Sequence, residues 1–142
     1  MSESVSFSVF GTLPGLNEII DANRRHRYQG AALKRSADTI VLQYIRVARV
    51  QPFVGPVFLT FAWHEPDRRR DCDNVAAGKK FILDALVTAG ILAGDGRKNV
   101  VGFSDEFHTD PPNPRVVITL EPVVYLEPGC ERRVDTTKRR KA

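Results

Sequence analysis

A strand followed directly by a connector and a helix is the strongest structural signal in this sequence. The run "GPVFLTFAWHEP" (55–66) is rich in β-branched and aromatic residues and lies between two prolines, as is typical of a strand buried on at least one face. After the connector, "NVAAGKKFILDALVTAG" (74–90) has apolar residues at helical spacing, with Gly90 just past its end. Gly78 inside this pattern indicates either a late helix start or a close backbone approach. This order favours folds in which helices pack on a sheet.

The flanking segments predict further strands and helices. Alternating residues in "SVSFSVFGTL" (4–13) indicate a first strand that ends at a turn. The remaining predicted elements are helices from about residue 16 and from about 30 to 50, and strands at about 100–108 and 115–123. The expected fold class is α+β (mixed α/β): a single small domain with a mixed sheet of about four strands and two to three helices.

The last 16 residues differ from the rest in charge and in pattern. The segment "EPGCERRVDTTKRRKA" (127–142) has six Lys or Arg against three Asp or Glu, whereas residues 1–126 have 15 against 14. It also lacks apolar periodicity. We therefore expect one domain over residues 1–126 and a basic, disordered tail over residues 127–142.

Several protein classes are disfavoured by the sequence. No run approaches the roughly 18 to 20 consecutive apolar residues of a membrane-spanning helix, and the N-terminus lacks a secretory signal pattern. Cys72 and Cys130 are too few for a disulfide framework. "GDG" (94–96) is neither a Walker A loop nor a dinucleotide fingerprint. We expect a cytoplasmic protein with no membrane partner and no organic cofactor.

The connector "DRRRDCDN" (67–74) places Asp71 and Asp73 beside three arginines. In an extended connector, residues two apart point the same way, so the two carboxylates can converge on one divalent cation, and oxygen ligands suit Mg²⁺ or Mn²⁺. Asp95, in the turn after the helix, is a candidate third ligand. Each aspartate also has a structural alternative, because Asp71 or Asp73 can act as a helix N-cap and Asp95 can simply favour the turn.

Basic residues near these aspartates indicate an anionic partner. Lys80 lies seven residues after Asp73, on nearly the same helical face, where it can neutralise a phosphate. Alternatively, it pairs with Asp84 at i+4. Other cations concentrate in "NRRHR" (23–27) and "RRR" (68–70), for which a solvated surface is the alternative interpretation.

The run "PDRRRDCDNVAAGKKFILDALVTAGILAGD" (66–95) resembles the RusA family of Holliday-junction resolvases, small Mg²⁺-dependent endodeoxyribonucleases often found in prophages. The shared features are D-x-D-N, a following Lys, D-A-L, A-G and an acidic residue in the next turn. "LPGLNEII" (13–20) also resembles the family's early Leu-Pro turn, with Asn17 shortly after it. The resemblance extends from about residue 12 to residue 122.

This resemblance implies a set of roles. Asp71, Asp73 and Asp95 would be the catalytic aspartates that hold Mg²⁺, with Mn²⁺ as a possible substitute, and Lys80 would be the essential lysine. Three residues more than in the simplest family pattern separate Asn74 from the lysine, so Lys79 is a competing candidate. The family also implies a homodimer that presents two sites to a four-way junction and cuts two strands symmetrically.

The sequence thus predicts a Mg²⁺-dependent, structure-selective endodeoxyribonuclease that resolves Holliday junctions in DNA recombination and repair. The residues expected to contact DNA are Arg68, Arg69, Arg70, Asn74, Lys79, Arg24, Arg25 and Arg27. The alternatives are a non-catalytic branched-DNA-binding protein of the same fold, a metal-dependent nucleotide phosphohydrolase, and a plain structural protein.

Overall fold

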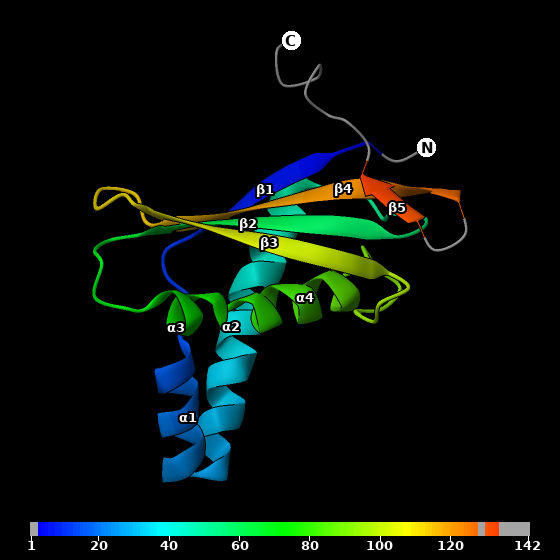
Figure 1. Cartoon of the computed structure of the whole chain (residues 1–142). Helices are drawn as coiled ribbons and strands as arrows, with labels where there is room; N and C mark the ends of the chain where they lie inside the picture. The colour runs from blue at the N-terminus through cyan, green and yellow to red at the C-terminus, as the bar shows by residue number, and fades with distance from the viewer. Residues whose placement is uncertain (1–2, 128–129, 134–142) are drawn as a thin grey trace.

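The apolar residues at every second position of the strands lie on one face of a single sheet. The computed structural model describes residues 3–127 and 130–133, and Figure 1 shows the helices packed against that face. In chain order the elements are β1 (Val5–Phe10), α1 (Leu16–Arg25), α2 (Arg27–Ala48), β2 (Val57–Glu65), α3 (Cys72–Ala76), α4 (Lys79–Thr88), β3 (Val100–Thr109), β4 (Arg115–Glu127) and β5 (Cys130–Arg133).

The sheet has the strand order β1-β4-β2-β3, and β5 pairs with β4. β4 is antiparallel to β1 and to β2, whereas β2 and β3 are parallel, with Glu65 opposite Thr109 where both strands end. A parallel pair needs a crossover connection, which α3 and α4 supply. The carboxyl ends of β2 and β3 therefore meet at one edge of the sheet, close to the connector that leads into α3.

The hydrophobic core lies between the sheet and two of the helices. Leu59, Phe61 and Ile118 of the sheet are fully buried and belong to one cluster with Val41 of α2 and Ile82 of α4. Each side chain of this size contributes about 1.5–3 kcal/mol when it leaves water. The core thus fixes α2 and α4 across the sheet, and the connector between β2 and α4 is anchored at both ends.

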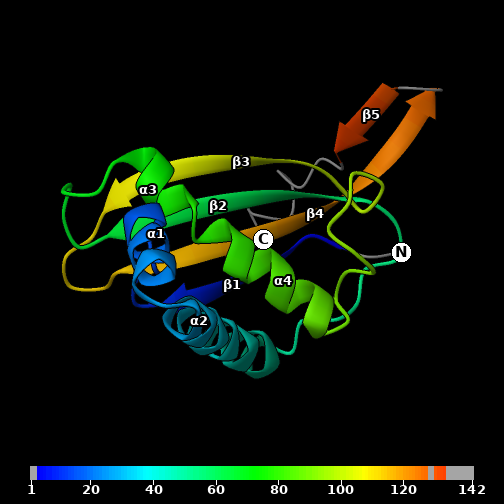
Figure 2. The same cartoon turned by 90° about the horizontal axis from the view of Figure 1, so that it is seen from below.

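The helices α1 and α2 form a hairpin that projects away from the sheet (Figures 1 and 2). No α1 residue is buried. Ile19 packs against the core, but Leu16 and Ile20, which the helical spacing places on the same face, are 38% and 39% exposed. The far end of the hairpin is therefore a solvent-exposed tip.

The predicted α+β class with a mixed four-stranded sheet is confirmed, and β5 adds a short fifth strand. The described residues contain four helices rather than two to three, because the helix predicted over 74–90 is split into α3 and α4. None of the helices within residues 3–127 and 130–133 is long and apolar enough to cross a membrane.

Gly78 lies at the split between α3 and α4. A Cβ atom at this position would lie 3.1 Å from Leu13 Cβ and 3.4 Å from the Trp63 ring, so the backbone approaches its neighbours closely. Both interpretations of Gly78 are therefore confirmed, since α4 also starts directly after it. At the other end of α4, Gly90 has a φ of +77°, a conformation that favours glycine after a helix.

The predicted tail over 127–142 is wrong in its first part. β4 extends to Glu127, and residues 130–133 form β5, with Val123 opposite Arg133 in the antiparallel pairing. Strand pairing satisfies backbone hydrogen bonds and needs no apolar periodicity, so the absence of that pattern did not exclude a strand. Residues 134–142 lie outside the described part of the chain.

We expect Gly78→Val to destabilise the fold, because the added side chain overlaps Leu13 and the Trp63 ring. Overpacking of this kind costs about 1–3 kcal/mol. Gly96→Val is the matched control, since nothing lies within 4 Å of a Cβ there. Urea unfolding gives the free energies, and equal unfolding midpoints for the two variants would contradict the close packing at Gly78.

Candidate functional site

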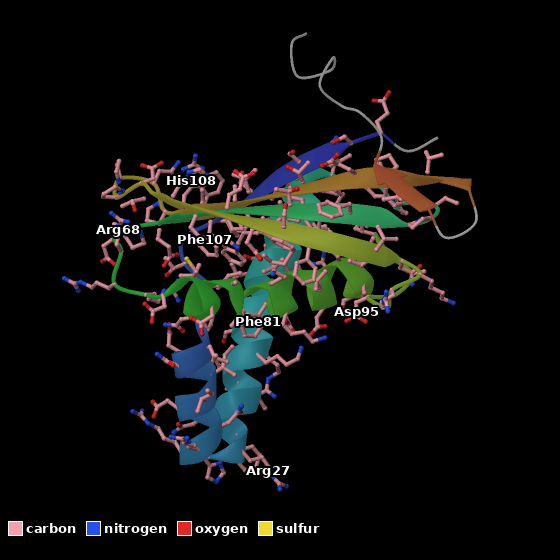
Figure 3. All side chains as sticks on the ribbon, in the orientation of Figure 1. Arg27, Arg68, Phe81, Asp95, Phe107 and His108 are labelled. Atoms are coloured by element: carbon pink, nitrogen blue, oxygen red, sulfur yellow. The ribbon has the colours of Figure 1, made fainter. Side chains whose placement is uncertain are left out.

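The candidate site lies in the connector between β2 and α3, beyond the carboxyl ends of two parallel strands. Ligands of α/β sheets commonly bind at such edges. A cavity of about 280 Å³ opens here, and its lining includes Arg68, Asp71, Cys72, Phe107 and His108. Figure 3 labels three of these residues, Arg68, Phe107 and His108, at the same end of the molecule. Cys72 is a free, exposed thiol.

Arg70 anchors the connector to the rest of the fold. Its Nε and Nη2 atoms donate to one carboxylate oxygen of Glu65, at 2.9 and 2.8 Å. Its Nη1 atom donates to the carbonyl oxygen of Leu13 at 3.1 Å and lies 3.4 Å from a carboxylate oxygen of Glu18. Only 21% of the Arg70 side chain is exposed. Arg70, predicted to contact DNA, therefore has its donors engaged within the protein.

Asn74 makes a second anchor on the other side of the aspartates. Its Oδ1 accepts a hydrogen bond from the backbone N–H of Asn17 at 3.0 Å. It also lies so close to Gly15 that a Cβ there would be 2.5 Å from Asn74 Oδ1. Asn74 therefore holds α1 against α3. The two sequence segments that carry the RusA resemblance touch each other at this hydrogen bond.

Asp71 and Asp73, which lie between these two anchors, are exposed. Asp71 occupies the N-cap position of α3, as one structural alternative predicted, but its side chain makes no capping hydrogen bond. Within the described residues neither carboxylate has a hydrogen bond or an ion pair to another residue. The connector therefore holds two free carboxylates on a backbone that Arg70 and Asn74 fix on both sides.

The two aspartates were predicted to converge within an extended connector, but the connector is not extended at both of them. Asp71 has extended backbone angles, but Asp73 already lies in the first turn of α3, so the two do not alternate as in a strand. Asp71 lines the cavity and Asp73 does not. Asp95 lies beneath α4, at the end of the molecule away from Arg68 (Figure 3). Among residues 3–127 and 130–133, no group of three or more His, Cys, Asp and Glu side chains is placed to hold a metal ion.

Lys80 and Asp95 form a charged cluster with Asp84. Lys80 Nζ lies 3.0 Å from a carboxylate oxygen of Asp84 and 3.1 Å from one of Asp95, so the predicted i+4 pair is present. Hydrogen bonds to Asp84 and Asp95 raise the pKa of Lys80, so the ammonium stays charged. Burial raises the pKa of Asp84, but hydrogen bonds from Lys80 and Lys34 outweigh it and leave that pKa below its ordinary value. The break between α3 and α4 removes the shared helical face that was predicted for Asp73 and Lys80.

Lys79 has a different environment from Lys80. Its Nζ donates to Asp105 at 2.7 Å and lies 3.8 Å from the centre of the Phe103 ring. The same Asp105 accepts from the indole N–H of Trp63 at 2.8 Å. Only 12% of the Lys79 side chain is exposed, against 65% for Lys80. Lys79 therefore fixes the start of α4 on the sheet, and Lys80 is the lysine that a ligand can reach.

The remaining predicted arginines fall into two separate groups. Arg68 and Arg69 are exposed beside the carboxylates, and Arg69 lies 3.7 Å from Asp67. Arg24, Arg25 and Arg27 are at the tip of the hairpin, and Figure 3 shows Arg27 far from Arg68. A ligand that touches both groups must extend over the length of α1.

Sequence reasoning missed the partners that order the site. No sequence pattern marks Glu65 or Leu13 as part of the site. Each one belongs to it only because it accepts a hydrogen bond from Arg70 in the folded protein. Asp105 could have been identified, since it is a charged residue on the inward side of a predicted strand. No protein-family model matches the chain, and a search of curated proteins found no relative.

We expect Arg70→Ala to destabilise the protein by about 2–3 kcal/mol, because it leaves the poorly exposed Glu65 carboxylate without its partner. Arg69→Ala is the matched control, since 89% of that side chain is exposed and its change should stay within about 0.5 kcal/mol. Urea unfolding distinguishes the two. Equal stability of both variants would show that Arg70 does not anchor the connector.

Proposed function

We propose that the chain is a Mg²⁺-dependent endodeoxyribonuclease that cuts branched DNA such as four-way junctions and acts as a homodimer. The observation that carries this proposal is the pair of unpartnered carboxylates, Asp71 and Asp73, on a connector fixed by Arg70 and Asn74. Rigid support of this kind is what a site of accurate geometry requires. The resemblance to the RusA family supplies the reaction type, the branched substrate and the dimer.

The donor set fits Mg²⁺ better than a softer metal. Mg²⁺ is usually held by one or two carboxylates, with water and substrate phosphates completing its shell, so Asp71, which lines the cavity, would be one ligand and Asp73, in the first turn of α3, would be the second. Asp95 remains a predicted third ligand, although its carboxylate contacts Lys80. Because Asp95 lies at the end of the molecule away from Arg68 (Figure 3), joining the other two would also require the turn that carries it to move. When bound, Mg²⁺ supplies a water of lowered pKa and stabilises charge on the phosphate oxygens.

The chain's own residues would position the DNA. Arg68 and Arg69 are exposed cations next to the carboxylates and would hold backbone phosphates on either side of the cut. Lys80, kept charged by its two aspartate partners, would neutralise negative charge on the bound strand. Hydrolysis then breaks one phosphorus–oxygen bond as water adds to phosphorus, and a proton passes to the leaving oxygen. Binding through phosphates makes affinity fall steeply with salt.

Asp73→Asn should abolish cleavage of a synthetic four-way junction in Mg²⁺ while leaving junction binding intact, because it removes a ligand charge but no phosphate contact. Glu3→Gln is the matched control, since Glu3 is exposed and precedes β1, at the sheet edge opposite β3. Gel assays of binding and of strand cleavage measure the two effects. Full cleavage by Asp73→Asn would exclude Asp73 from catalysis.

Lys80→Ala should lower the cleavage rate by about 10²-fold, the usual effect of removing one group that stabilises developing charge. Lys98→Ala, which removes an exposed lysine from the turn that contains Asp95, should have little effect. Lys79→Ala should act differently and lower stability, because it breaks the contact with Asp105. Thermal unfolding and single-turnover cleavage of all three variants separate these roles.

A non-catalytic branched-DNA-binding protein is the second candidate function. It is favoured by the lack of a three-carboxylate group among the described residues and by the pairing of Asp95 with Lys80. Wild-type protein that binds junctions but leaves them uncut in both Mg²⁺ and Mn²⁺ would support this function over the nuclease.

A further inference from the structure

The tip of the α1–α2 hairpin is a surface that the proposed cleavage site does not use. The two helices meet at His26, which has an extended backbone and caps α2. Figures 1 and 3 show this tip at the end of the molecule opposite the sheet, with Arg27 pointing into solvent. It is therefore free to contact a partner without obstruction from the rest of the described chain.

An aromatic pair is exposed at this tip. The rings of His26 and Tyr28 stack, with their centres 4.9 Å apart and an angle of 14° between their planes. Tyr28 is 73% exposed, although it is a large aromatic residue. The backbone N–H of Tyr28 donates to Nδ1 of His26 at 3.1 Å, which fixes the imidazole against the start of α2. The pair thus presents an ordered, flat and largely open ring surface.

Arginines surround the aromatic pair. Arg25 pairs with Asp21 at 3.1 Å, and both side chains are mostly exposed. Arg24 and Arg27 are also exposed, and within the described residues neither has an ion pair or a side-chain hydrogen bond. A stacking surface with two uncompensated cations beside it matches a ligand that has both a flat ring and a negative charge.

Close packing keeps the tip in shape. A Cβ atom on Gly30 would lie 1.8 Å from Asn23 Oδ1 and 3.5 Å from Asn23 Cα, so a side chain at position 30 would have to displace the Asn23 side chain. The backbone N–H groups of Gln29 and Gly30 both donate to the carbonyl oxygen of His26. The tip is therefore a tight turn between two helices.

We propose that this tip binds an unstacked base of single-stranded or branched DNA, with the base stacked on Tyr28 and the adjoining phosphates held by Arg24 and Arg27. Every base has a flat face, so stacking accepts any sequence, and the arginines account for the charge of the backbone. This inference deepens the proposed function, since it takes DNA as the ligand, but it involves neither the metal nor the carboxylates. It assigns to Tyr28 a role in recognising the branch rather than in cutting it.

The test measures binding without metal, by fluorescence anisotropy in EDTA, so that cleavage plays no part. Wild-type protein, Tyr28→Ala and Tyr28→Phe are titrated into a labelled single-stranded oligonucleotide and into the same oligonucleotide with abasic sites. Tyr28→Ala should weaken binding to the intact strand roughly ten-fold, and Tyr28→Phe should keep it, because the ring remains. Loss of the bases should weaken wild-type binding but leave Tyr28→Ala unchanged.

Two control variants complete the design. Val47→Ala removes a side chain that is 79% exposed on the same helix, and it should bind like wild type. Arg24→Ala should weaken binding to intact and abasic strands equally and reduce the salt slope by about 1.

The inference is overturned if Tyr28→Ala binds the intact strand as tightly as wild type, or if the tip binds anionic vesicles and no oligonucleotide. Binding that depends on Tyr28 in a protein that never cuts DNA would support the inference and reject the nuclease. Junction cleavage that requires Asp73 but does not depend on Tyr28 would support the nuclease and reject the inference.

Discussion

The contacts of one guanidinium group determine how the site is built. Arg70 joins the end of β2, through Glu65, to the turn before α1, through the Leu13 carbonyl, and to α1 itself, through Glu18. These elements are distant in sequence, and Leu13 itself belongs to the buried core. Because the planar guanidinium donates in several fixed directions, a single side chain can hold all three in one arrangement. The hydrogen bond from the backbone of Asn17 to Asn74 also joins α1 to α3, on the other side of the aspartates.

This arrangement explains why two of the three neighbouring arginines leave Asp71 and Asp73 unpaired. An aspartate near a free arginine would normally form an ion pair, which at the surface contributes about 0–1 kcal/mol. Here Arg70 is engaged with Glu65 and the Leu13 carbonyl, and Arg69 lies near Asp67, so neither of these two arginines neutralises Asp71 or Asp73. Arg68 is exposed and makes no ion pair within the described residues. Within the described residues no cation pairs with either carboxylate, so both stay accessible to solvent. The free charges are thus a consequence of how the scaffold uses its own cations.

The sequence predicted the fold more completely than the site. Strand alternation identified β1, and a β-branched and aromatic run between two prolines identified β2, because both signals depend on local sequence alone. The anchors Arg70 and Asn74 were assigned to DNA, because a polar side chain beside a cationic run does not reveal a partner 57 residues away. The prediction that Asp73 and Lys80 share a helical face was wrong for a related reason. Helical spacing extends only as far as the helix, and the close approach at Gly78, where α4 begins, is a tertiary contact.

The length of α1 relates the two proposed DNA contacts. α1 begins next to Asn74 and runs for 10 residues to the hairpin tip, which places the tip about 15 Å from the carboxylates. Since each DNA strand rises about 3.4 Å per nucleotide, a base at Tyr28 and a phosphate at Asp71 would be about four or five nucleotides apart. In a continuous duplex, every base at that distance is stacked and unavailable to the tip. A branch point, a strand end or a single strand offers an unstacked base and a backbone together, so both surfaces could be occupied at once on such DNA but not on a continuous duplex.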